Sequence, residues 1–411
     1  MTPLAKMICA AIVVSTALGV YLRLRQMATV TRNRDVTPRD FAKEVTLEEH
    51  RRAADYTLAR TRFSIFETVY DGILSLLWLL FWLAPLYNII AQVTAPGLNR
   101  SVALFVAFVA LAELLAMPLS LADTFWLEAR FGFNRQSLAS FLADWLKAGA
   151  LQLAIGAPLL YAMFALLRAA PDYWWLCAFV GFMAFIVAMM AVYPTFIAPL
   201  FNKFSPLPED DLRRRLEALL QKCGFESRGL YVMDASTRSA RGNAYFTGFG
   251  KAKRIVLFDT LLAKHTPEEI ESILAHELGH FKFGHIRQML AMAAGLAFVG
   301  FAALHWALGP QGLSVVFSLP ADPGLALIIA VLAKDPLMHI LSPLIAWRSR
   351  RAEFEADDFA KRMVGKEPMI AALTRLTRDN LATLTPDRLY ALFYYSHPPV
   401  PVRVAHLRGK G

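Results

Sequence analysis

The chain has 411 residues, a formal net charge of +10 and a hydrophobic content of 56 %. Its mean hydropathy of +0.41 is too high for a soluble protein of this length, so we expect a membrane protein. Its three cysteines form no C-x-x-C pair, which argues against a disulfide framework or a thiolate zinc site. The basic residues gather in particular loops, and membrane topology explains this pattern more simply than nucleic-acid binding.

Seven apolar runs follow one another along the chain, each near the roughly 20 residues that cross a bilayer core. The first run has a basic flank, Arg23 and Arg25, but no clear small-x-small cleavage site, so we interpret it as an uncleaved span rather than a secretory signal. Five runs lie before residue 204 and two lie after it: 4–22, 73–90, 102–122, 148–167, 173–193, 289–308 and 325–347.

Water-exposed segments divide the chain in two. A basic connector of mixed charge after the first span predicts a solvated helical segment. Prolines and acidic residues at 206–211, followed by a charged amphipathic helix, mark a second water-exposed region. We therefore expect an N-terminal membrane domain at 1–203, with about five transmembrane helices and the cytoplasmic connector. A second domain at 204–411 would include two further transmembrane helices and a C-terminal helical region.

The distribution of charge predicts which side these segments face. Seven spans put the two ends of the chain on opposite sides of the membrane. The side of the N-terminus carries few basic residues, chiefly Lys6, Arg100 and Arg168. The other side carries the connector, the water-exposed part of the second domain and the C-terminal region, so the positive-inside rule makes it cytoplasmic.

The segment His276-Glu277-Leu278-Gly279-His280 has the pattern H-E-x-x-H. On a helix, this spacing puts both imidazoles on one face, where they can hold one Zn²⁺, with Glu277 beside the metal as a general base. A solvated helix with incidental histidines is the alternative. The sequence Thr-Pro-Glu-Glu at 266–269 contains a capping box, which predicts that a helix starts there, about three turns before the histidines.

A catalytic zinc ion needs a third protein ligand. A nearby third histidine is excluded, because Phe283 and Ile286 occupy the positions where an extended motif would have its glycine and histidine. Glu353 and Asp357 share one face of a predicted helix, so one carboxylate could bind zinc and the other could accept a hydrogen bond from a ligand histidine. Glu355 points away from that face. An ordinary solvated charged helix fits this spacing equally well.

Two further histidines have simple structural explanations. His285 follows His280 by five residues and is rotated off the ligand face, so we expect a histidine at the helix boundary. His397 precedes two prolines and, from the residues alone, could either end a helix or act in catalysis.

Short β-like runs precede the H-E-x-x-H segment. They lie at 230–233 and 255–258, with 243–246 between them, and predict a small sheet beside the zinc helix. An extended peptide could add to its edge as a further strand, so that main-chain hydrogen bonds hold the scissile bond over the metal.

These motifs together resemble the type I CAAX prenyl proteases, which are integral-membrane gluzincin metalloproteases. The matching segments follow the family order through most of the chain: PLFN at 199–202, VMD at 232–234, NAYF at 243–246, HELGH at 276–280, Glu353 with Asp357, and SHP at 396–398. The resemblance implies a mainly α polytopic membrane protein, with about seven transmembrane helices enclosing a chamber. It also implies a small α/β gluzincin domain with the HExxH helix and a short β-sheet.

The resemblance also implies roles for single residues. It makes Glu353 the third ligand of one zinc ion per chain and Asp357 the carboxylate that supports a ligand histidine. The remaining implied residues are Glu277 as the catalytic base, His397 at the oxyanion, and Asn243 and Arg403 in substrate binding. Glu355 stands where eukaryotic members often carry glutamine, and the chain is shorter than theirs; we expect a bacterial-type member.

The predicted function is that of an integral-membrane zinc metalloendopeptidase, which hydrolyses peptide bonds through a zinc-activated water. Its expected partners are peptide or protein substrates, with or without a lipid group, and membrane lipids; nucleic acid is not expected. The resemblance points to cleavage of C-terminal tails of prenylated proteins, and a quality-control endopeptidase without a prenyl requirement is the alternative. A zinc-regulated transporter is less favoured, because it would not need Glu277. The expected location is the inner or plasma membrane of a bacterium, or the endoplasmic reticulum of a eukaryote, with the site towards the cytoplasm.

Overall fold

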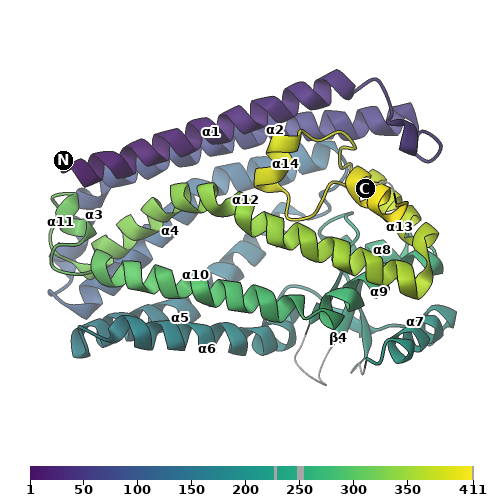
Figure 1. The fold of residues 1–411 in the computed structure, drawn as a ribbon. Coiled ribbons are helices and arrows are strands. Elements are labelled where there is room, and N and C mark those ends of the chain that lie inside the picture. Colours follow the sequence, from purple (N-terminus) through teal and green to yellow (C-terminus); the bar gives the residue numbers. More distant parts are fainter. Residues whose placement is uncertain (226–228, 248–253, 410–411) are drawn as a thin grey trace.

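The computed structural model describes residues 1–225, 229–247 and 254–409. The architecture is mainly helical, with long helices side by side and a small sheet at one end of them (Figure 1). Within the described ranges, seven helical segments are long and apolar enough to cross a membrane. All seven predicted apolar runs lie in these segments or overrun them by a residue, and the predicted fold class is confirmed.

The first two long helices form an antiparallel hairpin. α1 (Pro3–Asn33) runs to the connector, and α2 (Leu47–Leu77) starts with a capping box at Thr46 and continues through a π-helical turn into α3 (Leu83–Val93). Both helices extend beyond their apolar runs. Arg34 pairs with Asp55 at 2.7 Å across the turn, so the basic connector consists largely of two solvated helix ends.

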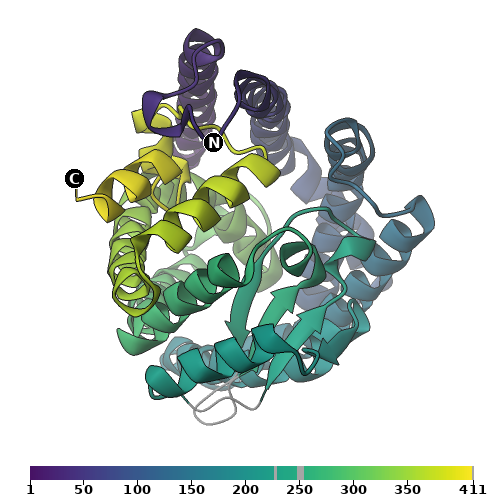
Figure 2. The ribbon, with the colours of Figure 1, turned by 90° about the vertical axis from the view of Figure 1, so that its right-hand side faces the viewer.

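The other membrane helices complete a ring, seen from its end in Figure 2. α4 (Leu98–Ala122) ends in a π-helical turn and is followed by α5 (Leu138–Ala169) and α6 (Trp174–Val192). After the sheet, α10 (His285–Ala307), α11 (Leu313–Val316) and α12 (Pro323–Val364) close the ring. α12 is long enough to leave the membrane half of the molecule and to enter the half that holds the sheet.

The sheet has four strands in the order β1-β2-β4-β3. β2 (Leu230–Met233) pairs in parallel with β4 (Arg254–Phe258), whose other neighbour is the antiparallel edge strand β3 (Ala244–Thr247). Sequence reasoning missed β1 (Phe204–Pro206), which pairs antiparallel with β2. Three residues that include a proline carry no strand pattern of their own.

Six shorter helices in the described ranges pack on the sheet, on α12 or on one another. They are α7 (Asp211–Lys222), α8 (Asp259–Leu262), α9 (Pro267–Lys282), α13 (Lys366–Asp379), α14 (Arg388–Tyr394) and α15 (Val400–Leu407). Of these, α14 also contacts α1. One hydrophobic core joins the sheet to α7, α9, α12 and α13, with fully buried side chains such as Leu216, Leu257 and Leu278. This core fixes α9 against the sheet on one side and against α12 on the other.

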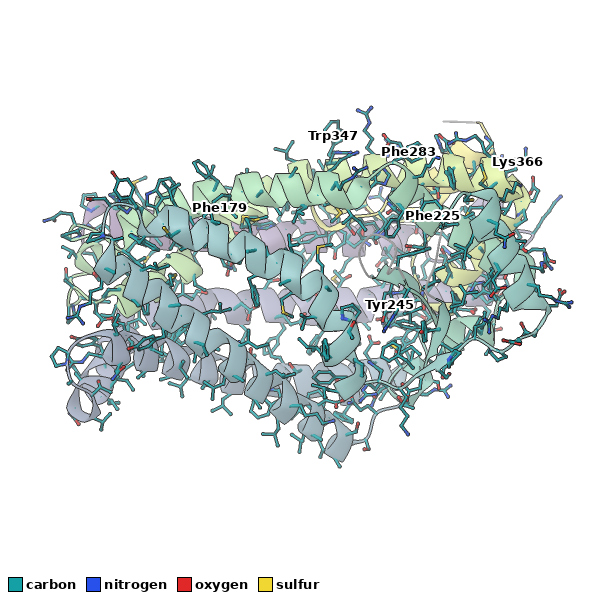
Figure 3. All side chains as sticks on the ribbon, turned by 90° about the horizontal axis from the view of Figure 1, so that it is seen from below. Phe179, Phe225, Tyr245, Phe283, Trp347 and Lys366 are labelled. Atoms are coloured by element: carbon teal, nitrogen blue, oxygen red, sulfur yellow. The ribbon has the colours of Figure 1, made fainter. Side chains whose placement is uncertain are left out.

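A second hydrophobic core lies among the membrane helices and contains Leu104, Phe164, Trp174 and Leu325. Beside this core lies an apolar cavity of about 730 Å³, lined mainly by α4, α5 and α6. Figure 3 shows the molecule from below, with Phe179 of α6 in the membrane half and Tyr245 of β3 in the half with the sheet. The molecule therefore has a densely packed half around the sheet and a more open membrane half.

Candidate metal centre

The H-E-x-x-H segment lies in α9, as its sequence predicts. The Thr266 hydroxyl accepts a hydrogen bond from Glu269 N at 3.3 Å, and the Glu269 carboxylate accepts one from Thr266 N at 3.1 Å. Pro267 occupies the first turn, where its missing N–H costs nothing. This capping box fixes the helix start, so the two histidines lie well inside a regular helix.

A close approach of two helices brings the third ligand to the histidines. A Cβ added to Gly279 of α9 would lie 2.9 Å from the Ala356 Cα of α12, which is closer than real Cβ contacts come. Ala356 itself is fully buried. Small residues on both helices therefore allow α12 to pass directly over α9, one turn from Glu353.

The side chains of His276, His280 and Glu353 converge on one point and form a metal-binding group. The two Nε2 atoms lie 3.2 Å apart. Each lies 3.4 Å from one Glu353 oxygen, His276 from Oε2 and His280 from Oε1. Ligand atoms about 2.0–2.1 Å from a tetrahedral zinc ion lie about 3.3 Å apart, so these spacings fit zinc.

The hydrogen bonds of Glu353 support the same assignment. Its Oε2 atom is buried and accepts no hydrogen bond of normal geometry in the described part of the chain, although His276 Nε2 and Arg403 Nη1 each lie 3.4 Å from it. A buried carboxylate oxygen with only such long contacts is free to bind a metal ion directly. The donor set, two imidazoles and one carboxylate, is also that of a catalytic zinc site with one open position.

Asp357 and Arg403 support the first ligand histidine. The His276 Nδ1 atom lies 2.9 Å from Asp357 Oδ1, and the Arg403 guanidinium bonds the same carboxylate at 2.6 and 2.8 Å. Burial lowers the pKa of His276, but its hydrogen bonds to Asp357 and Glu353 outweigh this and raise the pKa to about 9. With a metal on Nε2, the proton on Nδ1 would remain as the donor to Asp357.

Glu277 follows His276 on α9. Loss of hydration raises the pKa of its carboxyl, and the Glu353 carboxylate adds to this rise, whereas His276, His280 and Arg403 oppose it. A carboxyl with a raised pKa beside a metal site suits a general base that must take up a proton and release it again near neutral pH.

His285 is the first residue of α10 and so lies at a helix boundary, as its spacing predicts, but it also contacts a ligand histidine. It is 2 % exposed, and its Nδ1 lies 2.9 Å from His280 Nδ1. Its other nitrogen, Nε2, lies 3.0 Å from Glu355 Oε2. The reason is Gly284, which has φ +66° in the left-handed region and ends α9, so that α10 starts in a new direction and returns His285 to His280.

His397 lies in the segment between α14 and α15. Its Nε2 is 3.3 Å from Glu353 Oε1, and its Nδ1 is 2.9 Å from the Ser396 hydroxyl. Its side chain is 64 % exposed, unlike those of the metal-binding group. Arg350 of α12 donates to the Tyr395 carbonyl at 2.8 Å and so holds this segment near the site. His397 therefore reaches the same point from the solvent side.

The structure places Asn243 and Arg403 in different surroundings. Asn243 is exposed just before the edge strand β3, and its main-chain oxygen accepts a hydrogen bond from Phe258 N at 3.0 Å. β3 contacts α9 and has only β4 as a strand neighbour in the described ranges. Arg403 is 7 % exposed, and its guanidinium also lies 3.4 Å from Glu353. It lies behind the ligands rather than at the sheet edge.

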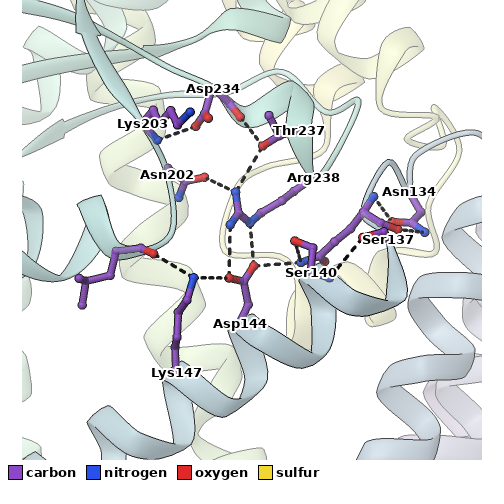
Figure 4. Close-up of polar contacts among 12 residues, drawn as sticks. Asn134, Ser137, Ser140, Asp144, Lys147, Asn202, Lys203, Asp234, Thr237 and Arg238 are labelled. Carbon is purple, nitrogen blue, oxygen red and sulfur yellow. Dashed lines mark hydrogen bonds and ion pairs between the residues drawn. The ribbon is translucent and has the colours of Figure 1, made fainter.

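A polar cluster connects α5 to the segment that leads into β3 (Figure 4). Asp144 of α5 accepts two hydrogen bonds from Arg238, at 2.9 and 3.3 Å. Arg238 also donates to the Asn202 side chain at 3.3 Å, and Lys203 N donates to Asp234 at 2.7 Å. The sequence gives no signal for this cluster, because its residues are far apart along the chain and come together only in the fold.

Seven membrane-crossing helices in the described ranges, together with a His-His-Glu group in the half that holds the sheet, define an integral-membrane metallopeptidase. Comparison with known families supports this class. Residues 26–203 match the family model described as CAAX prenyl protease N-terminal, five membrane helices, and residues 206–410 match Peptidase family M48. M48 peptidases are zinc-dependent metalloproteases. The chain belongs to the CAAX prenyl protease 1 family of M48 peptidases.

Individual relatives agree over nearly the whole length. The chain is 32 % identical to the CAAX prenyl protease 1 homolog of Arabidopsis thaliana, covering 95 % of this chain and 94 % of the relative. It is 30 % identical to the human homolog, covering 90 % and 88 %. A crystal structure of S. mikatae Ste24p superposes with a TM-score of 0.92 at 28 % identity and covers 99 % of both chains. These relatives are eukaryotic, so the expected bacterial-type membership has no support.

Proposed function

We propose that the chain is a zinc metalloendopeptidase that removes C-terminal tails from prenylated proteins on the cytoplasmic side of its membrane. The observation that carries the proposal is the His276, His280 and Glu353 group, with ligand atoms 3.2 to 3.4 Å apart, next to Glu277. A transporter with a regulatory zinc ion would have no use for that glutamate.

In this proposal, His276, His280 and Glu353 hold one zinc ion per chain. The ion supplies Lewis-acid polarisation of the scissile carbonyl and lowers the pKa of a water towards about 7. Glu277 takes the proton of the attacking water and returns it to the leaving amine. His397 donates a hydrogen bond to the oxygen that becomes negative, which its position 3.3 Å from Glu353 and its exposure allow.

The edge strand β3 is the proposed substrate site. An extended peptide that pairs with β3 would gain main-chain hydrogen bonds and would run alongside α9. Asn243, at the start of this edge, is placed to hold the peptide. Arg403 would act on substrate only through Asp357 and Glu353, because its guanidinium is bonded to those carboxylates.

The apolar cavity supports a prenyl-bearing substrate. Its volume of about 730 Å³ lies in the range of ligand pockets, and its wall is mainly apolar, with Glu113 and Gln152 among the lining residues. A second cavity of about 430 Å³ shares Glu113 and Trp145 with it and reaches Arg238 and Asn202. Arg238 lies six residues before β3, and we propose that the lipid of a substrate bound at β3 would reach the membrane half through these neighbouring cavities.

The chain offers a direct way to fill the apolar cavity. Gly149, Gly156 and Gly181 line it, and a Cβ added to any of them would meet nothing within 4 Å. Gly300 of α10 has the same open surroundings but does not line the cavity. Gly156→Leu therefore reduces the cavity, and Gly300→Leu is a matched control with the same change in composition.

The experiment compares a quenched fluorescent CAAX-type peptide with its farnesylated form, using purified protein in detergent. We expect cleavage by wild type, loss of cleavage after chelation and recovery with Zn²⁺. We expect Gly156→Leu to lower the preference for the farnesylated peptide by about tenfold and Gly300→Leu to leave it unchanged. Equal cleavage of both peptides by wild type would instead favour the quality-control endopeptidase. No zinc-dependent cleavage of either peptide would contradict the proposal.

A further inference from the structure

The two ligand histidines are supported differently. His276 bonds directly to a carboxylate, Asp357, with 2.9 Å between Nδ1 and Oδ1. The Nδ1 atom of His280 has no carboxylate partner in the described ranges; it lies 2.9 Å from another imidazole nitrogen, His285 Nδ1. In this series of hydrogen bonds the carboxylate, Glu355, comes after His285: His285 Nε2 lies 3.0 Å from Glu355 Oε2.

The hydrogen bonds from His280 to His285 and from His285 to Glu355 fix which ring nitrogens of the two histidines carry protons. His280 presents Nε2 to the metal-binding group, so a neutral His280 bound through Nε2 carries its proton on Nδ1. That N–H can donate only if His285 Nδ1 is an unprotonated acceptor. His285 must then carry its proton on Nε2, where Glu355 accepts it. The opposite tautomer of His285 would bring two N–H groups together at 2.9 Å.

Neighbouring residues hold His285 and Glu355 in position. His285 is 2 % exposed, so bulk water does not compete with it for the His280 N–H in the intact protein. The left-handed turn at Gly284 directs α10 so that its first residue meets His280. Glu355 is held from its other side by Arg351, with 3.4 Å between Nε and Oε1. The backbone turn at Gly284 therefore positions His285, and the ion pair with Arg351 positions Glu355, in both cases without a metal ion.

We propose that His285 is a positioning residue that fixes the tautomer and ring orientation of His280 for zinc, and that Glu355 fixes His285 in turn. This inference rests on the metal site proposed above. Its consequence is that Glu353, Glu355 and Asp357 of one helix act on the same centre. Glu353 serves as a ligand, and Asp357 supports His276 directly. Glu355 supports His280 through the imidazole of His285.

The test measures the zinc dissociation constant of purified apo protein by competition with a fluorescent chelator. Removing a hydrogen-bond partner of a ligand histidine typically costs about 10- to 100-fold in metal affinity. We expect this loss for His285→Leu, which leaves the His280 N–H without an acceptor. His285→Asn can present an amide oxygen near the former Nδ1 position and should recover most of the affinity. Glu355→Gln should resemble wild type, whereas Glu355→Leu should weaken zinc binding.

The control and a spectroscopic readout separate positioning from general destabilisation. His265 is also buried and pairs with a carboxylate, Glu269, at 3.0 Å, away from the metal-binding group. His265→Leu should lower thermal stability as His285→Leu does but leave the zinc affinity unchanged. The visible spectrum of Co²⁺-substituted protein should change in His285→Leu and remain as in wild type in His265→Leu.

Two results would overturn the inference alone, and a third would overturn it together with the proposed metal site. Wild-type zinc affinity in His285→Leu would show that His280 needs no support from His285. Equal losses in His285→Asn and His285→Leu would show that the acceptor is not what matters. A wild-type protein that binds no zinc would overturn the proposed metal site and this inference with it, so the two failures are distinguishable.

Discussion

The half of the molecule around the sheet, which holds the metal-binding group and is here the catalytic half, is packed more tightly than the membrane half. In the catalytic half, Gly279 of α9 and Ala356 of α12 leave no room for one further carbon atom. In the membrane half, a Cβ added to Gly156 or Gly181, which line the apolar cavity, would meet nothing within 4 Å. The metal-binding group thus rests on a tight contact of two helices, whereas the proposed path for the lipid lies along a wall with open space.

This difference suggests a division of tasks. Zinc chemistry requires ligand atoms placed within a few tenths of an ångström, which only a tightly packed contact provides. Passage of a flexible peptide or lipid chain requires space and tolerates variation in the wall. Substitutions in the catalytic half should therefore have large effects on turnover, and substitutions of the same size in the membrane wall should have small effects on stability.

The largest effect should come from Glu277→Gln. The substitution keeps the size of the side chain but removes the base, so we expect kcat to fall by about 10³- to 10⁴-fold. Zinc content, measured by metal analysis, should remain that of wild type, because Glu277 is not among the ligands. Substantial residual turnover with zinc bound would mean that another group accepts the proton.

His397→Ala should have the next largest effect. Loss of one donor to a developing oxyanion costs about 10²- to 10³-fold in kcat, and KM should change little because the interaction forms mainly in the transition state. Steady-state kinetics with the farnesylated peptide would measure both. If Glu277→Gln and His397→Ala left equal residual activity, the proposed division of roles between them would be wrong.

A pair of Gly→Ala substitutions tests the packing difference itself. Gly279→Ala should destabilise the protein by about 1–3 kcal/mol, since Ala356 backbone atoms block the new Cβ. It should also weaken zinc binding by moving Glu353 away from the histidines. Thermal unfolding with and without zinc would measure both changes. A Gly279→Ala protein as stable as wild type would show that the two helices can separate at no cost.

The smallest effect should come from the matching change in the membrane wall. Gly156→Ala adds a Cβ that meets nothing within 4 Å and removes a glycine from a helix interior. We expect stability to be unchanged or to rise by up to about 1 kcal/mol, measured by the same thermal unfolding. A loss as large as that of Gly279→Ala would contradict the view that this wall is open.

The sequence predicted those features that depend on local patterns. The seven spans follow from apolar runs, the start of α9 follows from its capping box, and β2 and β4 follow from short β-branched and aromatic runs. The convergence of His276 and His280 follows from helical spacing alone. Glu353 rested on resemblance, because spacing on α12 cannot say which helix faces it.

The features that were missed depend on contacts between distant segments. β1 exists because it pairs with β2, and Arg403 is buried because α15 packs behind α12. His285 lies at the helix boundary as expected, but its contact with His280 depends on the left-handed turn at Gly284, which helical spacing does not predict. A glycine directly before a histidine, just after a metal-binding helix, is the one local signal that could have indicated this turn.

The length of α12 sets the distance along this helix between the membrane span and Glu353. The helix has 42 residues, so it is about 63 Å long, roughly twice the hydrocarbon thickness of a bilayer. Glu353 lies about 45 Å along the axis from Pro323. Because one continuous helix crosses the membrane and carries this ligand, the height of bond cleavage above the lipid is set by a count of residues. We therefore expect cleavage to depend on the distance between the scissile bond of a substrate and the part of it that is anchored in the bilayer.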